Sequence, residues 1–336
     1  MKKIIALVGS LALMLSLTSC GADLNSDSAR SGERVYILKM STQINESHPL
    51  MEGLEQWAKN VEERTDGGLM IEIFPSGQFG YDEDVIEQAI LGANVAVLTD
   101  GARMSNYVHE LGIINMPYIV DNYDEALKIT GSSLFAEWEE QLAEEDGLRI
   151  LSFNWYDSAR HILTNTPVRT PADLKGLRLR TPGAPVWITT VETLGATPIA
   201  MGWGDAYNAL QIGAIEGVGA QHTASYGARM FEVTKYINKT AHIHLINGIV
   251  VGEKWFQSLP EEYQEILMEE CRSAAAENAR YVESIADDYE QKMVDNGMEV
   301  IEVDIEAFKA STESAYEILE FAELREQLYA ETGLKF

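Results

Sequence analysis

The chain alternates strand-like and helix-like segments from about residue 35 to about residue 250. Residues 35–40 and 69–74 have the composition of strands, and the segment between them carries apolar residues at helical spacing up to Gly67-Gly68. A β-α-β unit of this kind favours parallel strands joined by a right-handed crossover. The continued alternation therefore predicts an α/β architecture.

A second constraint is one helical pattern of unusual length. Ser258-Leu259-Pro260-Glu261 has the composition of a capping-box start, and apolar residues then recur at helical spacing until Gly297. Such a helix would be about 55 Å long at 1.5 Å per residue, which is more than one small domain needs. We expect it to run across two domains, and 336 residues are enough for two.

The N-terminus has the pattern of an export signal. Met1-Lys2-Lys3 is basic, residues 4–17 are mostly apolar but too few to span a membrane, and Leu17-Thr18-Ser19-Cys20-Gly21 resembles a bacterial lipoprotein signal. We expect residues 1–19 to be removed, Cys20 to carry lipid, and residues 20–33 to be a polar tether. The mature protein would then be an exported lipoprotein on the outer side of the cytoplasmic membrane. The alternative is an ordinary secretory signal with an incidental cysteine.

Charge and cysteine content exclude several classes. The net charge of -28 repels nucleic acid and anionic lipid surfaces, so we expect no nucleic-acid partner. The chain has two cysteines, and a lipidated Cys20 would leave Cys271 without a partner. We therefore expect no intrachain disulfide and interpret Cys271 as a small buried hydrophobic residue on a helix.

Two arginines lie on one short strand-like segment, residues 176–181. Strand side chains alternate, so Arg178 and Arg180 point to one face and Leu177 and Leu179 to the other. Arg180 comes last, where the strand gives way to a loop, and ligands of open α/β sheets bind at strand ends. Its guanidinium suits a carboxylate. We expect Arg178 to be a solvated surface charge.

Motifs for catalysis are almost absent. The chain has no Walker sequence, G-x-G-x-x-G, H-E-x-x-H or C-x-x-C, so we expect no cofactor and no metal. His242 and His244 share a strand face, but no third ligand is indicated. Ser225, His222 and Asp205 have the residue types of a catalytic triad, but no G-x-S-x-G motif accompanies them, so we do not interpret them as one. We interpret the chain as a binding protein; an exported hydrolase or lyase acting on a carboxylate is the alternative enzyme class.

Two segments resemble a known family, the DctP-type solute receptors of tripartite ATP-independent periplasmic (TRAP) transporters. They are the D-L-K-G-L-R-L-R-T-P run of residues 173–182 and the later A-L-Q-I-G of residues 209–213, and the resemblance extends from Val35 to the C-terminal helices. It implies an α/β fold of two lobes like a type II periplasmic binding protein, with an interlobe cleft and the long helix spanning both lobes. Lobe I would comprise residues 34–157 plus about 246–285, and lobe II residues 158–245 plus about 286–336.

The resemblance also implies a function. The protein would be an extracytoplasmic receptor that closes on an organic acid and delivers it to the membrane subunits of a TRAP transporter. The ligand would be a sugar acid, a C4-dicarboxylate or another small carboxylate. Large aromatic residues near the cleft are also compatible with an aromatic acid as the ligand. A sensor-type carboxylate-binding lipoprotein is the alternative.

The residues that the resemblance places at the ligand come from both lobes. Arg180 would be the principal carboxylate ligand and Arg160 a second ligand-facing arginine. Trp203 would be the aromatic cleft residue, Asp100 an acidic contact from the first lobe, and Ser41 a polar contact. The chain departs from the family where an asparagine is usual, because Ala220 stands there. That contact is lost or is taken over by Gln221 or His222.

Overall fold

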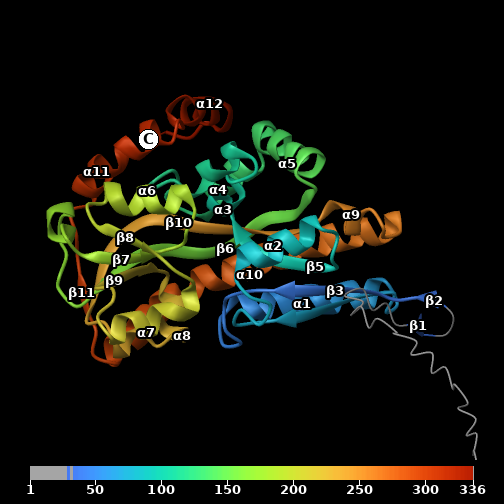
Figure 1. The fold of residues 1–336 in the computed structure, drawn as a ribbon, viewed down its shortest axis with the longest axis horizontal. Coiled ribbons are helices and arrows are strands. Elements are labelled where there is room, and N and C mark those ends of the chain that lie inside the picture. The colour runs from blue at the N-terminus through green and yellow to red at the C-terminus, as the bar shows by residue number, and fades with distance from the viewer. Residues whose placement is uncertain (1–28, 31–32, 336) are drawn as a thin grey trace, which may run out of the picture.

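The computed structural model describes residues 29–30 and 33–335 of the chain (Figure 1). The predicted signal peptide, Cys20 and most of the predicted tether lie outside the described residues. The strands are β1 Ala29–Arg30, β2 Glu33–Arg34, β3 Tyr36–Ser41, β4 Leu69–Phe74, β5 Val95–Asp100, β6 Leu148–Thr164, β7 Arg178–Thr181, β8 Thr197–Ala200, β9 Gly217–Ala220, β10 Tyr236–Gly252 and β11 Glu299–Ile301.

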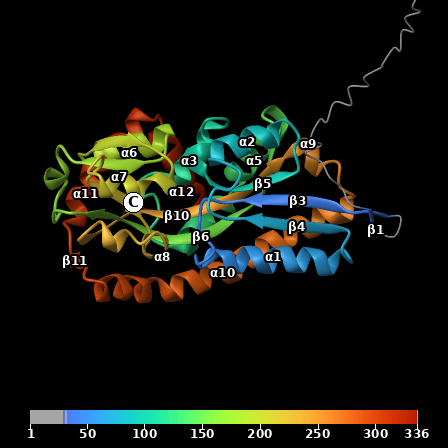
Figure 2. The ribbon, with the colours of Figure 1, turned by 60° about the horizontal axis from the view of Figure 1, so that its bottom comes forward.

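Helices cover both faces of the sheet that these strands form (Figure 2). The α-helices are α1 Leu50–Arg64, α2 Asp82–Ile90, α3 Gly101–Met104, α4 Tyr123–Thr130, α5 Ser133–Glu145, α6 Pro185–Thr193, α7 Ala206–Gln211, α8 His222–Gly227, α9 Glu253–Phe256, α10 Glu261–Asp295, α11 Ile305–Ile318 and α12 Ala322–Thr332. Short 3₁₀ helices are η1 His109–Asn115, η2 Pro171–Leu174, η3 Trp203–Asp205 and η4 Met230–Glu232.

One sheet runs through the whole molecule in the order β4-β3-β5-β10-β6-β9-β7-β8, with β11 beside β10. The strands β3, β4 and β5 are parallel to one another, as are β7, β8 and β9. The central pair, β6 and β10, is antiparallel and each strand is 17 residues long. The α/β class, the two-lobed fold and the β-α-β start are therefore confirmed.

The strand directions explain why a cleft forms in the middle. Strand β5 is antiparallel to β10, and β9 is antiparallel to β6, so β5 and β9 point in opposite directions. Asp100 at the end of β5 pairs with Asn247, and Ala220 at the end of β9 pairs with His161. The carboxyl ends of the two parallel strand sets thus face each other across the centre of the β6–β10 pair.

Core packing follows from the strand pattern. All six residues of β5 are buried, because helices cover both faces of this strand. Val95 and Val97 contribute to one hydrophobic cluster with α2, and Ala96 and Leu98 contribute to another with α1 and α10. Cys271 of α10 lies in this second cluster, fully buried, and burial raises the pKa of its thiol to about 12. Its interpretation as a buried hydrophobic residue is confirmed.

Helix α10 spans the molecule as predicted, over 35 residues or about 52 Å. Its first half packs on α1 and its later part on α8, and Figure 2 shows it running beneath both halves of the sheet. The expected capping box is wrong. The helix begins at Glu261, so Ser258 lies too far upstream to cap it, and its hydroxyl instead donates to the Trp255 carbonyl at 2.6 Å.

The C-terminal helices contact elements of both predicted lobes. Helix α11 packs on α6, whereas α12 packs on α4 and η1. Tyr329 of α12 donates a hydrogen bond to the Ile119 carbonyl at 3.0 Å. Residues 322–332 thus lie against a part of the chain that we expected to belong to lobe I, and the lobe boundaries stay a prediction. Within the described residues, no helix combines the length and apolar character needed to cross a membrane.

The contact between α1 and α10 leads to a prediction about stability. A Cβ atom at Gly53 would lie 2.7 Å from the Asn278 side chain and 3.0 Å from the Trp155 ring. Gly53→Ala should therefore lower the free energy of unfolding by about 1–3 kcal/mol through overpacking, although alanine usually favours a helix. Urea unfolding followed by circular dichroism measures the change.

The matched control is Glu55→Ala, an exposed position on the same helix. It should change the free energy of unfolding by no more than about 0.5 kcal/mol. A Gly53→Ala protein as stable as the unaltered chain would contradict the tight contact between the two helices.

Candidate anion-binding cleft

A cavity of about 420 Å³ lies between the two facing sets of strand ends. Residues 42–44 after β3 and 98–100 of β5 line it from one side. Residues 182–184 after β7, 200–203 at and after the end of β8, and 220–221 at and after the end of β9 line it from the other. Its volume is that of a small-molecule site, and its position at carboxyl strand ends is where open α/β sheets bind ligands.

A bulge in β6 places two charged residues in this cavity. Ala159 pairs with His244 and Tyr156 pairs with Ile246, so two residues of β6, Asp157 and Ser158, face a single residue of β10. Ser158 has φ 71°, an unusual value for a residue other than glycine. Asp157 and Arg160 are three positions apart and would face opposite ways on a regular strand. The bulge brings both to the cavity wall.

Arg180 and Arg160 are the main cationic groups of the wall. Only 4% of Arg180 and 7% of Arg160 are exposed, and among the described residues neither has a carboxylate within ion-pair distance. Arg180 donates from Nε to the Met201 carbonyl at 3.0 Å, and Arg160 donates from Nη2 to the Gly219 carbonyl. The guanidinium carbons lie 5.4 Å and 4.8 Å from the ring centroids of Trp203 and Trp187, respectively.

Burial acts on the protonation of both arginines. It lowers the pKa of Arg180 to about 9, assisted by the nearby charge of Arg160, and it lowers the pKa of Arg160 to about 10. Both groups stay charged at neutral pH. Asp100 acts on both arginines at longer range, as does Asp157 on Arg160 and Asp82 on Arg180, and these acids oppose the lowering of the two pKa values. Among the described residues none of these acids forms an ion pair with Arg160 or Arg180, so the two buried guanidinium groups favour an incoming anion.

The arginine on the other end of β7 behaves differently. Arg178 forms an ion pair with Glu216 and donates to the Gly213 carbonyl at 2.8 Å, and 42% of its side chain is exposed. It does not line the cavity. Arg178 thus lies outside the cavity, but it is ion-paired and partly exposed and is not the solvated surface charge that we expected.

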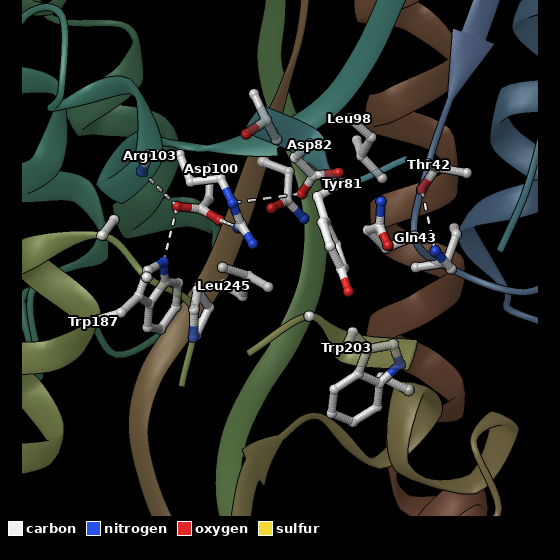
Figure 3. A pocket seen from close by; sticks show the side chains of 18 of the residues that line it. Thr42, Gln43, Tyr81, Asp82, Leu98, Asp100, Arg103, Trp187, Trp203 and Leu245 are labelled. Atoms are coloured by element: carbon white, nitrogen blue, oxygen red, sulfur yellow. Dashed lines mark hydrogen bonds and ion pairs between the residues drawn. The ribbon is translucent and has the colours of Figure 1, made fainter. Parts of the chain in front are cut away.

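A third arginine, Arg103, lies in the cavity but is compensated. Its Nε lies 2.8 Å from Glu83 Oε1, and it also forms an ion pair with Asp100. Asp100 Oδ1 accepts hydrogen bonds from the Arg103 backbone N–H at 2.9 Å and from Trp187 Nε1 at 3.0 Å (Figure 3). Although burial alone would lower it, the neighbouring acids hold the pKa of Arg103 above its usual value.

The cavity brings together five of the seven residues predicted to contact the ligand. Arg180, Arg160, Trp203, Asp100 and Gln221 line it. Their contacts with a ligand remain predictions, and Asp100 already uses its oxygens for Arg103 and Trp187.

The other two predicted residues lie behind the cavity wall. Ser41 is fully buried, and its neighbours Thr42 and Gln43 line the cavity instead. His222 is buried on α8, stands 3.7 Å from Glu290 Oε2, and has a pKa lowered to about 4 by burial. Their assignment as ligand contacts also remains untested.

The sequence reasoning missed several residues of the wall, chiefly Asp82, Arg103, Asp157 and Tyr81. Asp82 lies at the start of α2, and Arg103 lies three residues beyond the end of β5. The position of Arg103 just after a strand could have identified it as a candidate from the sequence, because ligands bind at strand ends. Asp157 gave no such signal, because only the bulge turns it toward the cavity.

Contacts also join the two sides of the cleft at its mouth. Tyr81 donates its hydroxyl to Asp205 Oδ2 at 2.8 Å, and its ring packs so closely on Gly202 that a Cβ there would lie 2.1 Å from it. With the Trp187–Asp100 bond, two side-chain hydrogen bonds between described residues therefore connect the two sides. Among the described residues, no group of three or more histidine, cysteine or acidic side chains is arranged to hold a metal ion.

Comparisons with known proteins agree with this geometry. Residues 40–323 match bacterial extracellular solute-binding protein family 7, DctP. A TRAP periplasmic solute-binding protein from Escherichia fergusonii, solved in an open form without ligand, is 37% identical, with a TM-score of 0.78 over 88% of this chain and 99% of that chain. One from Ochrobacterium anthropi with bound L-fuconate is 31% identical, with a TM-score of 0.85 over the same shares.

A third relative is the C4-dicarboxylate-binding periplasmic protein DctP of Vibrio cholerae. It is 27% identical over 256 residues, which cover 76% of this chain and 75% of that protein. The family match covers well over half of the chain. The chain therefore belongs to bacterial extracellular solute-binding protein family 7, the DctP family of TRAP solute receptors.

Proposed function

We propose that this protein is an exported receptor that binds the carboxylate of an organic acid between Arg180 and Arg160. The observation that carries this proposal is a pair of buried guanidinium groups that lack an acidic partner among the described residues. A ligand carboxylate would supply the missing charge and accept hydrogen bonds from both planar forks. A sugar acid, a C4-dicarboxylate and another small carboxylate all meet this requirement.

The relatives support an organic acid as the ligand class. One structural neighbour holds L-fuconate, a sugar acid, and one relative is named for binding C4-dicarboxylates. The family is one of solute receptors, and we assign binding rather than catalysis to the cleft. The membrane subunits of a TRAP transporter are the proposed recipients of the ligand. A sensor role is the alternative, and two adjacent genes for multi-span membrane proteins would favour transport.

The first prediction about function concerns the arginine pair. Arg180→Ala should weaken ligand binding by about 2–5 kcal/mol, because a desolvated carboxylate loses its charged partner. Arg160→Ala should have a smaller effect in the same direction. A thermal-shift screen of organic acids identifies a ligand, since binding to the native state raises the melting temperature. Calorimetry with that ligand then measures each variant.

Two matched variants control this experiment. Arg178→Ala should leave affinity almost unchanged, because Arg178 lies outside the cavity on the same strand. Arg180→Lys should still bind poorly, because an ammonium group cannot reproduce the planar fork. Equal losses from Arg178→Ala and Arg180→Ala would refute the assigned site.

The second prediction concerns attachment. We propose Cys20 as the lipid anchor, so Cys20→Ser should release the exported protein into the soluble fraction. A lipid chain contributes about 0.8 kcal/mol of membrane-binding free energy per buried CH₂ group, and the Cys20→Ser protein loses this contribution. Fractionation followed by a salt wash gives the readout. A Cys20→Ser protein that stays with the membrane would rule out the lipoprotein interpretation.

The third prediction concerns motion of the lobes. The TM-score is higher with the L-fuconate-bound neighbour than with the open one, although sequence identity is lower, which supports a closed arrangement. A ligand that contacts both sides should shift an open population toward this closed state. Small-angle scattering should show a smaller radius of gyration with ligand. An unchanged radius at calorimetric saturation would instead favour a rigid site.

A further inference from the structure

The charged groups of the cavity wall divide into a compensated set and an uncompensated set. The wall carries three guanidinium and four carboxyl groups, which are those of Arg103, Arg160, Arg180, Asp82, Glu83, Asp100 and Asp157. Acids of the protein itself compensate the charge of Arg103. Its Nε lies 2.8 Å from Glu83 Oε1 and 3.6 Å from Asp82 Oδ2, and it forms an ion pair with Asp100. The cations open to a ligand are therefore Arg160 and Arg180.

Arg160 and Arg180 together form a single cationic region of the cavity wall. Both side chains also line a small void of about 10 Å³ together with Trp187, so they lie side by side in the wall. The charge of Arg160 contributes to the lowered pKa of Arg180. We expect a single carboxylate held here to contact both guanidinium groups. Among the described residues, a second carboxylate on the ligand would find no uncompensated cation in the cavity.

Two acids of the wall, Asp157 and Asp82, have no hydrogen-bonded cationic partner among the described residues, although Arg160 acts on Asp157 and Arg103 on Asp82 at longer range. Asp157 Oδ1 accepts from Thr223 Oγ1 at 3.1 Å and lies 3.4 Å from His48 Nε2. Burial lowers the pKa of His48 to about 3, so this histidine is neutral. Asp82 approaches Arg103 only at 3.6 Å, and its Oδ1 has no hydrogen-bond partner among the described residues. Both acids are at most 5% exposed.

The chemistry of these acids defines what can lie beside them. An ionised carboxylate only accepts hydrogen bonds, so it pairs with a hydroxyl donor and repels another carboxylate. We propose that Asp157 and Asp82 accept hydrogen bonds from ligand hydroxyl groups, so that the cleft selects a polyhydroxy monocarboxylate and rejects a dicarboxylate of equal length. This inference rests on the proposed function, in which the arginine pair holds the ligand carboxylate.

The surroundings of the two acids fit a polyhydroxy chain. Figure 3 shows Asp82, Gln43 and Thr42 on one side of the cavity and Trp203 on the other. Gln221 and Asn247 add amide groups to the wall, and Gln221 Nε2 has no hydrogen-bond partner among the described residues. Hydroxyl groups both donate and accept, so they can bond with acids and amides alike.

The test compares ligands that differ in one group. D-gluconate and D-glucarate share their hydroxyl configuration and differ only in that the terminal CH₂OH of gluconate is a carboxylate in glucarate; D-galactonate and galactarate form a second pair. Calorimetry on the full chain at pH 8 keeps both acids ionised, since burial raises the pKa of Asp157 to about 7 and that of Asp82 to about 6. In at least one pair, the monocarboxylate should bind at least tenfold more tightly.

Opposite results separate this inference from the proposed function. A dicarboxylate, either of these or succinate, that binds as tightly as the best monocarboxylate overturns the inference and leaves the proposed function intact. If no member of an organic-acid panel binds, the proposed function fails and the inference fails with it.

Amide variants test whether the two acids cause the preference for the monocarboxylate over the dicarboxylate. Asp157→Asn and Asp82→Asn keep the side-chain shape and remove the charge, so at least one should lower the preference for the monocarboxylate by threefold or more. Asp66→Asn, at an exposed position outside the cavity, should leave the preference unchanged. Circular dichroism verifies folding. An unchanged preference in both folded variants overturns the role of these acids, and the ligand pairs decide the selectivity even if a variant fails to fold.

Discussion

The antiparallel pairing of β6 with β10 is the constraint on which the rest of the structure depends. These two strands run through both halves of the molecule, and every other strand of the large sheet joins on one side or the other of their pair. Because β5 and β9 attach with opposite directions, their carboxyl ends meet above the middle of the pair. The cleft is thus a consequence of strand direction. The bulge at Asp157–Ser158 lies at this midpoint and turns charged side chains into the space between the lobes.

Electrostatics in the cleft are organised by which charges the protein compensates itself. Arg103 is neutralised by its own acids, and Arg178 is neutralised by Glu216 outside the cavity. In the part of the chain that the structure describes, the close contacts of Arg160 and Arg180 are with backbone carbonyls and tryptophan rings, and acids act on them only at longer range. Such contacts hold a guanidinium in place but do not cancel its charge. The same cleft carries Asp157 and Asp82, which have no hydrogen-bonded cationic partner among the described residues. It therefore presents two guanidinium groups without an ion pair and several hydrogen-bond acceptors within one small volume.

Much of the fold could be predicted from sequence because it follows from local patterns. Period-two alternation predicted β7 and separated Arg180 from Leu179, and helical spacing predicted the span of α10. The capping box at Ser258 failed because a short motif does not determine where a helix begins when Pro260 directly precedes it. The resemblance to the receptor family supplied Arg160 and Trp203, which lie in the cleft, and Ser41 and His222, which lie just behind its wall. Their roles at the ligand remain predictions.

By itself the sequence determined the α/β class, the long helix, and an arginine at the end of a strand, since each depends on residues close together in the chain. The tertiary structure alone decided which charges are compensated. Arg103 meets Glu83, Tyr81 meets Asp205 and Trp187 meets Asp100 only because the sheet brings separate segments together. Asp157 faces the cleft because of a bulge, which depends on how β6 pairs with β10 and not on the alternation within β6. The charge arrangement of the cleft therefore depends on pairings between distant residues, which no local pattern encodes.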